Sequence, residues 1–308
     1  MKALVTGGAG FIGSNVAKLL LENGHEVVVL DNLSTGYREN LEALQQAAFV
    51  EGDIRDGELV AKLMQRVEVV FHLAASVGNR RSIDNPILDS QINVIGTLHV
   101  LEGARHAGIR KVVYSSSAGI FGELKHLPIA EDHPTEPDTP YGVSKLSAEK
   151  LCLVYAQLYP LEAICLRYFN VYGVNQRYDA YGNVMPIFAR WLLNGEPLLI
   201  YDDGEQTRDF VNVRDVARAN LLAAHAEGLS GAFNIASGEA ITINHLAELM
   251  RGMVDEDVGV EYQPPRKGDV RDSLADISLA NKELGYSPSV DIENGLKEYI
   301  AWAAKEMI

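Results

Sequence analysis

The first 13 residues constrain the fold more than any other stretch of this chain. They read MKALVTGGAGFIG, so a strand-forming run at residues 3–5 ends in a cluster of glycines and a helical pattern begins at Phe11. We expect Gly7 to turn the chain sharply off a strand, Gly10 to let a pyrophosphate approach the backbone, and Gly13 to let the new helix pack closely on the sheet. The free N–H groups and the positive end of the helix dipole would then face the phosphates.

A second predicted strand at residues 26–30 ends in Asp31, about 20 residues beyond the glycines, where a dinucleotide-binding fold places its ribose-binding acid. A carboxylate there accepts hydrogen bonds from both ribose hydroxyls and repels a 2′-phosphate. Strand, glycines, helix and acid together predict a site for NAD rather than NADP, the alternative being an ordinary strand-to-helix turn. The polar residues 32–36 follow and are placed to close over the adenosine.

Composition excludes several classes of function. The 308 residues are 47% hydrophobic and 22% charged, which suits a compact enzyme with one large domain or two unequal ones. The net charge of -15 repels nucleic acid and anionic membranes, so we expect neither as a partner. Cys152 and Cys165 lack metal-ligand spacing, so we expect reduced thiols and no metal site. The first strand leaves no room for a signal peptide, and we expect a cytoplasmic protein.

Further predicted strands alternate with helical patterns, at residues 48–51, 68–71, 111–114 and 163–167. This alternation predicts an α/β fold built on a Rossmann-type, doubly wound parallel sheet. Ligands of such sheets bind beyond the carboxyl ends of the strands. The candidate residues at those ends are Gly7, Asp31, Asp53, Ala74 and Ser117.

Two parts of unequal size are expected. We assign residues 1–170 to an NAD-binding Rossmann domain, with later segments near 205–240 returning to it. Residues 171–308 belong mainly to a smaller mixed α/β lobe that binds the substrate. Within the first part, a long helix is predicted over residues 84–107, and its apolar residues are assigned to the core or to a dimer contact. Residues 118–140 contain four prolines and are expected to form a loop over the site.

Polar residues near the strand ends carry competing interpretations. Asp53 follows the third strand and is placed to reach the adenine amino group, whereas Asp56 is expected to cap the next helix. His72 is expected to be a packed histidine at a strand end rather than a ligand. The small Ala74 and Ala75 permit close approach of a cofactor.

A tyrosine and a lysine supply the predicted chemistry. Tyr141 and Lys145 are four residues apart on a predicted helix, so they share one face. A nearby ammonium lowers a tyrosine pKa, which lets the phenolate take a proton from a hydroxyl near neutral pH. Ser117, at the end of the fifth strand, is placed to hydrogen-bond the same hydroxyl. Such a pair means little alone in a chain with 13 tyrosines, but its position in a dinucleotide fold indicates catalysis.

Motifs along nearly the whole chain carry a family resemblance. They are TGGAGFIGS, LDNLS, GDIRD, HLAA, NVIGT, YSSSAGIFG, YGVSK, LRYFNVYG, TRDFVNVRDVA, FNIASG and PPRKGDVRDSLAD. On these motifs the chain resembles the extended short-chain dehydrogenase/reductase superfamily, within it the NAD-dependent nucleotide-sugar epimerases and dehydratases. The resemblance is closest to the UDP-glucose and UDP-N-acetylglucosamine 4-epimerases.

The resemblance implies roles residue by residue. Tyr141 would be the catalytic base, assisted by Ser117 and Lys145. Residues that would hold NAD are Gly7, Gly10, Phe11, Ile12, Gly13, Asp31, Asn32, Ser34, Thr35, Gly36, Asp53, Ile54, Leu73, Ala74, Ala75, Asn93, Ser115, Tyr141, Lys145 and Tyr168. Residues that would hold the nucleotide sugar are Ser117, Tyr141, Asn170, Asn183, Tyr201, Arg208, Arg266, Asp269 and Ser273. The two arginines among these can each fork onto phosphate oxygens despite the acidic surface.

The residues after Ser117 distinguish the branches of this family. Sugar dehydratases typically carry Asp-Glu there, and nucleotide-sugar decarboxylases a Glu at the second position. This chain has Ala118 and Gly119, which leave no side chain to protonate or abstract. The 4-epimerase branch is therefore favoured: Tyr141 takes the 4-hydroxyl proton as hydride passes to NAD, the 4-keto sugar swings about its diphosphate, and hydride returns to the opposite face. NAD is then recycled rather than exchanged.

The substrate and the assembly are less sharply predicted. In similar epimerases a bulky tyrosine walls the 2-substituent of the sugar, and a local match places Ser273 at that wall, so N-acetylated UDP-hexoses are expected alongside UDP-glucose and UDP-galactose. Alternatives are a UDP-glucuronate 4-epimerase, for which Arg80 and Arg81 would bind the carboxylate, another nucleotide-sugar dehydratase or decarboxylase, or an NAD-sensing protein. The predicted helices that begin at Asp84 and Tyr141 carry apolar faces, and relatives dimerise through such helices, so we expect a homodimer.

Overall fold

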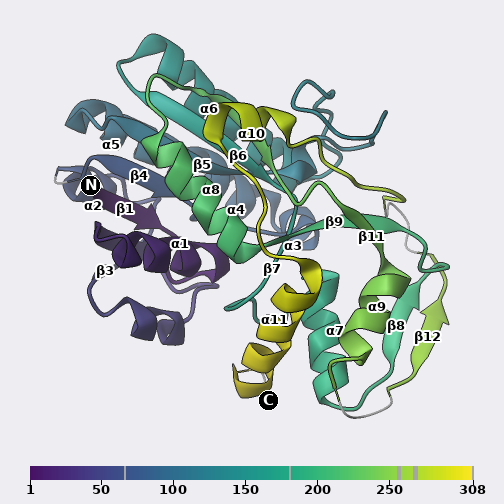
Figure 1. Cartoon of the computed structure of the whole chain (residues 1–308). Helices are drawn as coiled ribbons and strands as arrows, with labels where there is room; N and C mark the ends of the chain where they lie inside the picture. The colour runs from purple at the N-terminus through teal and green to yellow at the C-terminus, as the bar shows by residue number, and fades with distance from the viewer. Residues whose placement is uncertain (66, 180–181, 255–257, 266–269, 307–308) are drawn as a thin grey trace.

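A seven-stranded parallel sheet organises the larger part of the protein (Figure 1). The computed structural model describes all residues except 66, 180–181, 255–257, 266–269 and 307–308. The strand order is β10-β6-β5-β4-β1-β2-β3, so the chain starts inside the sheet and builds outwards in both directions, which confirms the doubly wound fold. The bounds are β1 Lys2–Thr6, β2 Glu26–Asp31, β3 Ala48–Glu51, β4 Val69–His72, β5 Lys111–Ser117, β6 Glu162–Tyr168 and β10 Gly231–Ile235.

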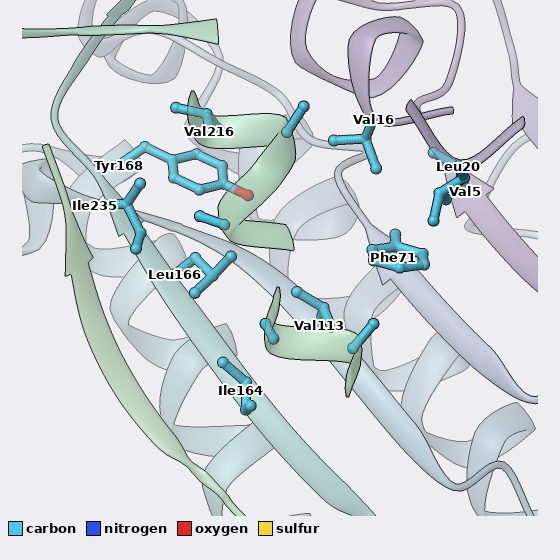
Figure 2. Packing of buried hydrophobic residues seen from close by; sticks show 14 of the residues in the cluster. Val5, Val16, Leu20, Phe71, Val113, Ile164, Leu166, Tyr168, Val216 and Ile235 are labelled. Atoms are coloured by element: carbon cyan, nitrogen blue, oxygen red, sulfur yellow. The ribbon is translucent and has the colours of Figure 1, made fainter. Parts of the chain in front are cut away.

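Helices cover both faces of this sheet. Successive side chains of a strand point to opposite faces, so Val113 packs in one core cluster with Val16 and Val216, while Val112 and Tyr114 pack in another. Figure 2 shows the first cluster, to which α1 and α8 contribute. The second is completed by α2, α5 and α6. These helices are α1 Phe11–Glu22, α2 Gly57–Met64, α5 Thr97–Ala107, α6 Pro140–Leu158 and α8 Val213–His225.

The segment between β4 and β5 is not the single helix expected over residues 84–107. It forms α3 (Asn79–Asp84), α4 (Pro86–Ser90), a π-helical turn (Gln91–Gly96) and then α5. Proline disfavours helical geometry at the residue before it, and Asn85, with φ -139° and ψ 65°, separates α3 from α4. The wide turn that follows shifts the register of the helix and contains Asn93.

A smaller lobe lies at one side of the sheet (Figure 1). It has a three-stranded sheet in the order β11-β9-β7 and a two-stranded sheet of β12 and β8. Phe188, Leu246 and Leu296 lie in its core, with Leu198 of β8. Its elements are β7 Asn170–Tyr172, α7 Val184–Leu193, β8 Leu198–Tyr201, β9 Thr207–Asn212, β11 Ala240–Thr242, α9 Ile243–Arg251, β12 Val260–Gln263 and α11 Ile292–Glu306.

The two parts are interleaved along the chain. After β7 the chain enters the lobe, yet α8 packs against α1 and β10 pairs with β6 of the central sheet. α8 begins at Val213, three residues earlier than its apolar pattern begins, because Asn212 Oδ1 accepts the Arg214 N–H at 2.9 Å and caps it. The short helix α10 (Ser278–Leu284) also contacts β10.

Two short 3-10 helices, η1 (Arg38–Leu44) and η3 (Ala118–Ile120), complete the described secondary structure near the carboxyl ends of the central strands. Among the residues that the structure describes, none of the helices combines the length and the apolar character that crossing a membrane requires.

Candidate active site

The glycine turn after β1 has an unusual backbone and close packing. Gly7 has φ 73°, and its N–H donates to Leu30 O at 2.8 Å. A Cβ at Gly13 would lie 2.1 Å from Gly7 O, so a side chain there would force α1 away from the turn. A Cβ at Gly10 would meet Gly7 O at 3.1 Å and is otherwise unobstructed by the described residues. The outer side of the turn is therefore open, and no side chain caps the start of α1.

Asp31 fixes this turn as well as facing it. Its Oδ2 accepts the Ala9 N–H at 2.9 Å and its Oδ1 accepts the Leu33 N–H at 2.8 Å, which leaves lone pairs on both oxygens for ribose hydroxyls. Burial raises the pKa of Asp31, and the backbone hydrogen bonds oppose that rise. A Cβ at Gly36 would lie 2.8 Å from Asp31 Oδ1, so this glycine is needed beside the carboxylate. The anchoring role of Asp31 toward the turn was not predicted.

Asp53 is more constrained than expected. Its Oδ2 accepts from Asn32 Nδ2 at 2.8 Å, and its carboxylate pairs with the Arg55 guanidinium at 2.8 Å. The hydrogen bonds from Arg55 lower the pKa of Asp53 to about 2. Asp53 thus joins the ends of β2 and β3, and contact with adenine stays a prediction. Asp56 caps α2 as expected, because its Oδ1 accepts the Leu59 N–H at 3.0 Å.

The end of β4 lies against the glycine turn. A Cβ at Gly7 would come within 2.6 Å of Ala74 N, so residues 73–75, of which Ala74 and Ala75 are small, lie directly beside the turn. Asn93 holds the next residue, Ser76: its Oδ1 accepts the Ser76 N–H at 2.8 Å and its Nδ2 donates to Ser76 O at 3.0 Å. Since Asn93 also donates to Ser144 Oγ at 3.0 Å, it links this loop to α6.

The predicted catalytic residues come together at the end of β5. Thr139 caps α6 by accepting the Gly142 N–H at 3.2 Å, and the helix starts at Pro140, which places Tyr141 in its first turn. The Ser117 side chain lies close enough to Tyr141 to lower the pKa of its hydroxyl. Lys145 is buried on the same helix and donates from Nζ to Ser115 O.

Electrostatics at this site differ from the expectation in one respect. Burial raises the pKa of Tyr141, with the Ser117 hydrogen bond opposing, rather than Lys145 lowering it. The same cause lowers the pKa of Lys145 to about 8. Removal from water is therefore the largest cause of the pKa shift of both Tyr141 and Lys145.

His72 is a packed residue, as predicted. Its Nδ1 lies 2.7 Å from Thr6 Oγ1 and its Nε2 lies 3.0 Å from Thr97 Oγ1. Burial first and Lys145 second lower the pKa of His72 to about 3, so it is neutral at physiological pH.

Gly119 lies directly beside the catalytic pair. A Cβ built there would be 3.4 Å from Ser117 Oγ and 3.6 Å from Tyr141 Cε1. The Gly119 N–H donates to Ser117 Oγ at 3.1 Å, which orients that hydroxyl. A side chain at position 119 would therefore face the reacting hydroxyls, and this chain has none.

A buried ion pair behind the site was missed by sequence reasoning. Glu149 of α6 accepts from Arg167 Nη2 at 2.8 Å and Nε at 3.0 Å, and from Ser116 Oγ at 2.7 Å. Arg167 also donates to Glu131 O at 2.8 Å, in the loop that follows β5. The network ties α6, β5, β6 and the loop together one residue from Ser117. Only the spacing of Glu149 one turn beyond Lys145 hinted at it.

The predicted substrate residues are spread over the lobe. Asn170 donates to Asp209 O at 3.2 Å, and Arg208 Nη1 donates to Thr207 O at 2.7 Å and Arg271 O at 3.3 Å. Asn183 is exposed at the start of α7, and Tyr201 ends β8. Ser273 is half-buried in the carboxyl-terminal motif. Arg266 and Asp269 lie outside the described residues.

Asp209 is a second organising residue that the sequence did not reveal. Its carboxylate accepts from Ser237 N at 2.8 Å, Ser237 Oγ at 2.6 Å, Gly238 N at 3.0 Å and Ala275 N at 3.2 Å. Burial raises the pKa of Asp209 while these bonds oppose the rise. The residue joins β9, the loop after β10 and the segment that carries Ser273.

The remaining NAD candidates fall into two groups. Phe11, Ser34 and Thr35 line a cavity of about 400 Å³ beside the start of α1. Ile12 and Tyr168 instead pack in the core, and the Tyr168 hydroxyl accepts from Asn220 Nδ2 at 2.8 Å, so these two would contact NAD through backbone atoms. Ile54 is also buried, against α5 and Gly96.

Comparison with known proteins adds the family. The family model described as the NAD dependent epimerase/dehydratase family matches residues 3–236. The chain belongs to this family. The predicted resemblance, the NAD cofactor and the enzyme class are thereby confirmed.

Several proteins similar to this chain are named 4-epimerases. A putative UDP-glucose 4-epimerase of Methanocaldococcus jannaschii is 41% identical over 97% of each chain. The crystal structure of a UDP-glucose 4-epimerase from Thermotoga maritima, with UDP-glucose, has a TM-score of 0.95, 41% identity and full coverage of both chains. A UDP-N-acetylglucosamine 4-epimerase from Methanobrevibacter ruminantium has a TM-score of 0.95 and 35% identity over 99% of each chain.

The described residues fit NAD. The open side of the turn at Gly10 and the start of α1 match the pyrophosphate. The carboxylate of Asp31 matches the ribose, and the adjoining cavity matches the adenosine. The cofactor would lie along the carboxyl ends of the strands, with Ser117, Tyr141 and Lys145 at the far end.

Proposed function

We propose that this chain is a UDP-hexose 4-epimerase that interconverts gluco and galacto forms by transient oxidation at carbon 4 of the sugar. The observation that carries the proposal is Gly119, because a Cβ there would lie 3.4 Å from Ser117 Oγ and 3.6 Å from Tyr141 Cε1. One base and one orienting hydroxyl are sufficient for reversible oxidation of an alcohol. Elimination or decarboxylation needs a further acid or base, and position 119 offers none.

Each catalytic side chain has a distinct task. Ser117 hydrogen-bonds the sugar hydroxyl and orients it toward Tyr141, which accepts its proton. Lys145 stabilises the phenolate from the same helix face. When bound, NAD would supply the hydride acceptor and donor, and its positive ring would oppose the rise that burial causes in the pKa of Tyr141. Since the reaction has no net redox change, the chain needs to keep its cofactor rather than exchange it.

The nucleotide diphosphate would lie between the sheet and the lobe. Arg208 is held in place by two backbone carbonyls and supplies the cation for a diphosphate on an acidic protein. Asn170, Asn183 and Tyr201 belong to the elements around it. Arg266 and Asp269 are proposed from their motif.

The preferred sugar is proposed from one position. Ser273 is a small residue in a segment fixed on both sides: Thr207 Oγ1 donates to Asp272 Oδ1 at 2.9 Å, and Ile129 N donates to Leu274 O at 2.7 Å. A small side chain on a rigid wall leaves room for an N-acetyl group. We therefore propose UDP-N-acetylglucosamine and UDP-N-acetylgalactosamine as substrates, with the plain UDP-hexoses accepted as well.

The alternative of a UDP-glucuronate epimerase depends on Arg80 and Arg81. Both belong to α3, where Arg80 pairs with Asp84 at 3.4 Å and Arg81 pairs with Asp179. Arg81 lines the cavity beside Ser34 and Thr35, the adenosine side of the site. This placement favours a neutral hexose over a uronate.

The domain division and the dimer are also proposals. Residues 1–170 with α8 and β10 form the NAD-binding part, and residues 171–308 otherwise form the lobe. Ile87 (74% exposed), Leu158 (67%), Val143 (50%) and Ile95 (46%) lie exposed on α4, the π-helical turn and α6, and pairing with a second copy would bury them. Cys152 and Cys165 are free and buried, which suits the reducing cytoplasm.

The test is a chromatographic assay of the purified protein without added NAD. UDP-N-acetylgalactosamine and UDP-galactose are supplied separately, and the gluco products are measured. Conversion of the N-acetylated sugar supports both the mechanism and the Ser273 argument, whereas conversion of UDP-galactose alone removes the latter. Tyr141→Phe must abolish both conversions, and conversion by that variant would refute the assigned base. No conversion even with NAD added would refute the proposed function.

A further inference from the structure

The segment of residues 174–179, which follows β7, crosses the start of α1. Asn15 Nδ2 donates to Val174 O at 3.0 Å and to Phe11 O at 2.9 Å. Asn175 Nδ2 donates to Ser14 Oγ at 2.9 Å, and Asn175 itself has φ 73°. We call this segment the strap. Its first residues are therefore bonded directly to the first turn of α1, where the phosphates of a dinucleotide would lie.

The middle of the strap is held from both sides through Arg177. Its guanidinium carbon lies 4.7 Å from the ring centre of Tyr37 and 5.7 Å from that of Trp302. Its Nη2 pairs with Glu306 Oε2 at 3.1 Å, and its Nη1 donates to Glu306 O at 2.9 Å. Tyr37 follows the polar residues after Asp31, whereas Trp302 and Glu306 belong to α11. Arg177 thus joins residues 32–37, which we call the adenosine loop, to α11, the last helix of the lobe.

Two further contacts hold the strap in place. Gln176 O accepts from the buried Tyr299 hydroxyl of α11 at 2.9 Å. Asp179, the last residue of the strap, forms an ion pair with Arg81 of α3. The cavity of about 400 Å³ has the strap, Tyr37 and Arg81 in its lining, along with Phe11, Ser34 and Thr35.

We propose that the strap, held by Arg177 and by the Arg81–Asp179 pair, is a retention device that keeps NAD in the enzyme between turnovers. This inference rests on the proposed function, in which the cofactor is recycled without net redox. A dinucleotide lying on the start of α1 and in this cavity would contact the strap, so its departure would be eased when the strap lifts from that helix or the adenosine loop moves away from the strap. Either motion separates Arg177 from Tyr37 or breaks the ion pair of Asp179.

Arg177 has the chemistry for this task. A guanidinium that stacks on two aromatic rings and pairs with a carboxylate makes several contacts at once, and each is lost when the strap opens. Its Nε is buried and has no hydrogen-bond partner among the described residues. Loss of these contacts should speed the release of NAD about ten- to a hundredfold. Each tenfold corresponds to about 1.4 kcal/mol of lost interaction.

The experiment measures release of the cofactor rather than activity. Full-length protein is saturated with NAD, freed of excess, and diluted into a coupled dehydrogenase that reduces released NAD to fluorescent NADH. Wild type is compared with Arg177→Met, which keeps the aliphatic stem, and with Asp179→Asn, which leaves α11 untouched. The matched control is Arg214→Met: Arg214 pairs with Glu298 of α11 at 2.7 Å and is remote from the strap in sequence and contacts.

We expect both strap variants to release NAD at least about tenfold faster than wild type, while Arg214→Met releases it at the wild-type rate and all four proteins melt within a few degrees of each other. Equal release by wild type and both strap variants would overturn the inference, as would equally fast release by the control. A wild type that binds no NAD would overturn it too. Failure of the proposed function would appear separately, as retained NAD without conversion of any UDP-hexose.

Discussion

The ion pair of Glu149 and Arg167 offers the sharpest test of how the catalytic helix is held. Both side chains are buried, and the Glu149 carboxylate accepts three hydrogen bonds, at 2.8 and 3.0 Å from Arg167 and at 2.7 Å from Ser116. Glu149→Gln keeps the shape but replaces one acceptor oxygen by a donor, which then faces a guanidinium or a hydroxyl. Removing one partner of a buried pair costs about 3–5 kcal/mol because the other charge stays uncompensated. That is a large part of the stability of a typical domain.

Urea unfolding followed by far-ultraviolet circular dichroism measures this loss. We expect Glu149→Gln to lower the free energy of unfolding by about 3 kcal/mol, while Arg214→Ala, which breaks an exposed pair with Glu298, costs at most about 1 kcal/mol. The double variant Glu149→Leu with Arg167→Met removes both charges together and should recover much of the loss. A cost below about 1 kcal/mol for Glu149→Gln, or no recovery in the double variant, would refute this account of the network.

Three further predictions concern the site itself. Gly10→Ala should abolish NAD binding while its free energy of unfolding stays near that of wild type. Gly13→Ala, with its Cβ 2.1 Å from Gly7 O, should lose NAD binding and also about 1–3 kcal/mol of stability. Equilibrium dialysis measures the NAD binding and urea unfolding measures the stability. Gly119→Glu should reduce epimerisation at least about tenfold while NAD stays bound, because the new side chain contacts Tyr141; unchanged turnover would contradict this. Folding lowers the pKa of Lys145 from 10.5 to about 8, so between pH 8 and 10.5 the unfolded chain binds more protons than the folded one. The free energy of unfolding of NAD-free wild type should therefore rise by about 3 kcal/mol relative to Lys145→Met as the pH rises from 8 to 10.5. Denaturation at each pH measures this difference.

The sequence predicted those features that short-range patterns encode. The alternation of apolar strands and helices was sufficient for the doubly wound sheet, since each strand of such a sheet is apolar on both faces. Gly7 and Gly13 were predictable because only glycine tolerates the turn and the close approach of α1. The same holds for Asp56 as a helix cap, which needs contacts only within the next turn.

Features that depend on contacts between distant residues were not predictable from patterns. Strands β7 and β11 have three residues each, too short for a period-two signal. Asp209 and Arg177 look like surface charges in the sequence, yet Asp209 anchors the loop after β10 and Arg177 joins α11 to the loop that ends at Tyr37. The π-helical turn around Asn93 arises from packing against α6 and leaves no mark in the apolar pattern.

The pKa directions at the site connect catalysis with cofactor retention. In the chain alone, burial raises the pKa of Tyr141 and lowers that of Lys145, so the tyrosine stays a neutral phenol and is a poor base. A further positive charge beside Tyr141 would oppose the first effect, and the family's cofactor carries one on its oxidised ring. An enzyme of this design is active only while that cofactor is bound. A strap that slows its departure therefore protects the base itself, and this is why we expect Arg177 variants to lose activity on dilution and to regain it when NAD is added.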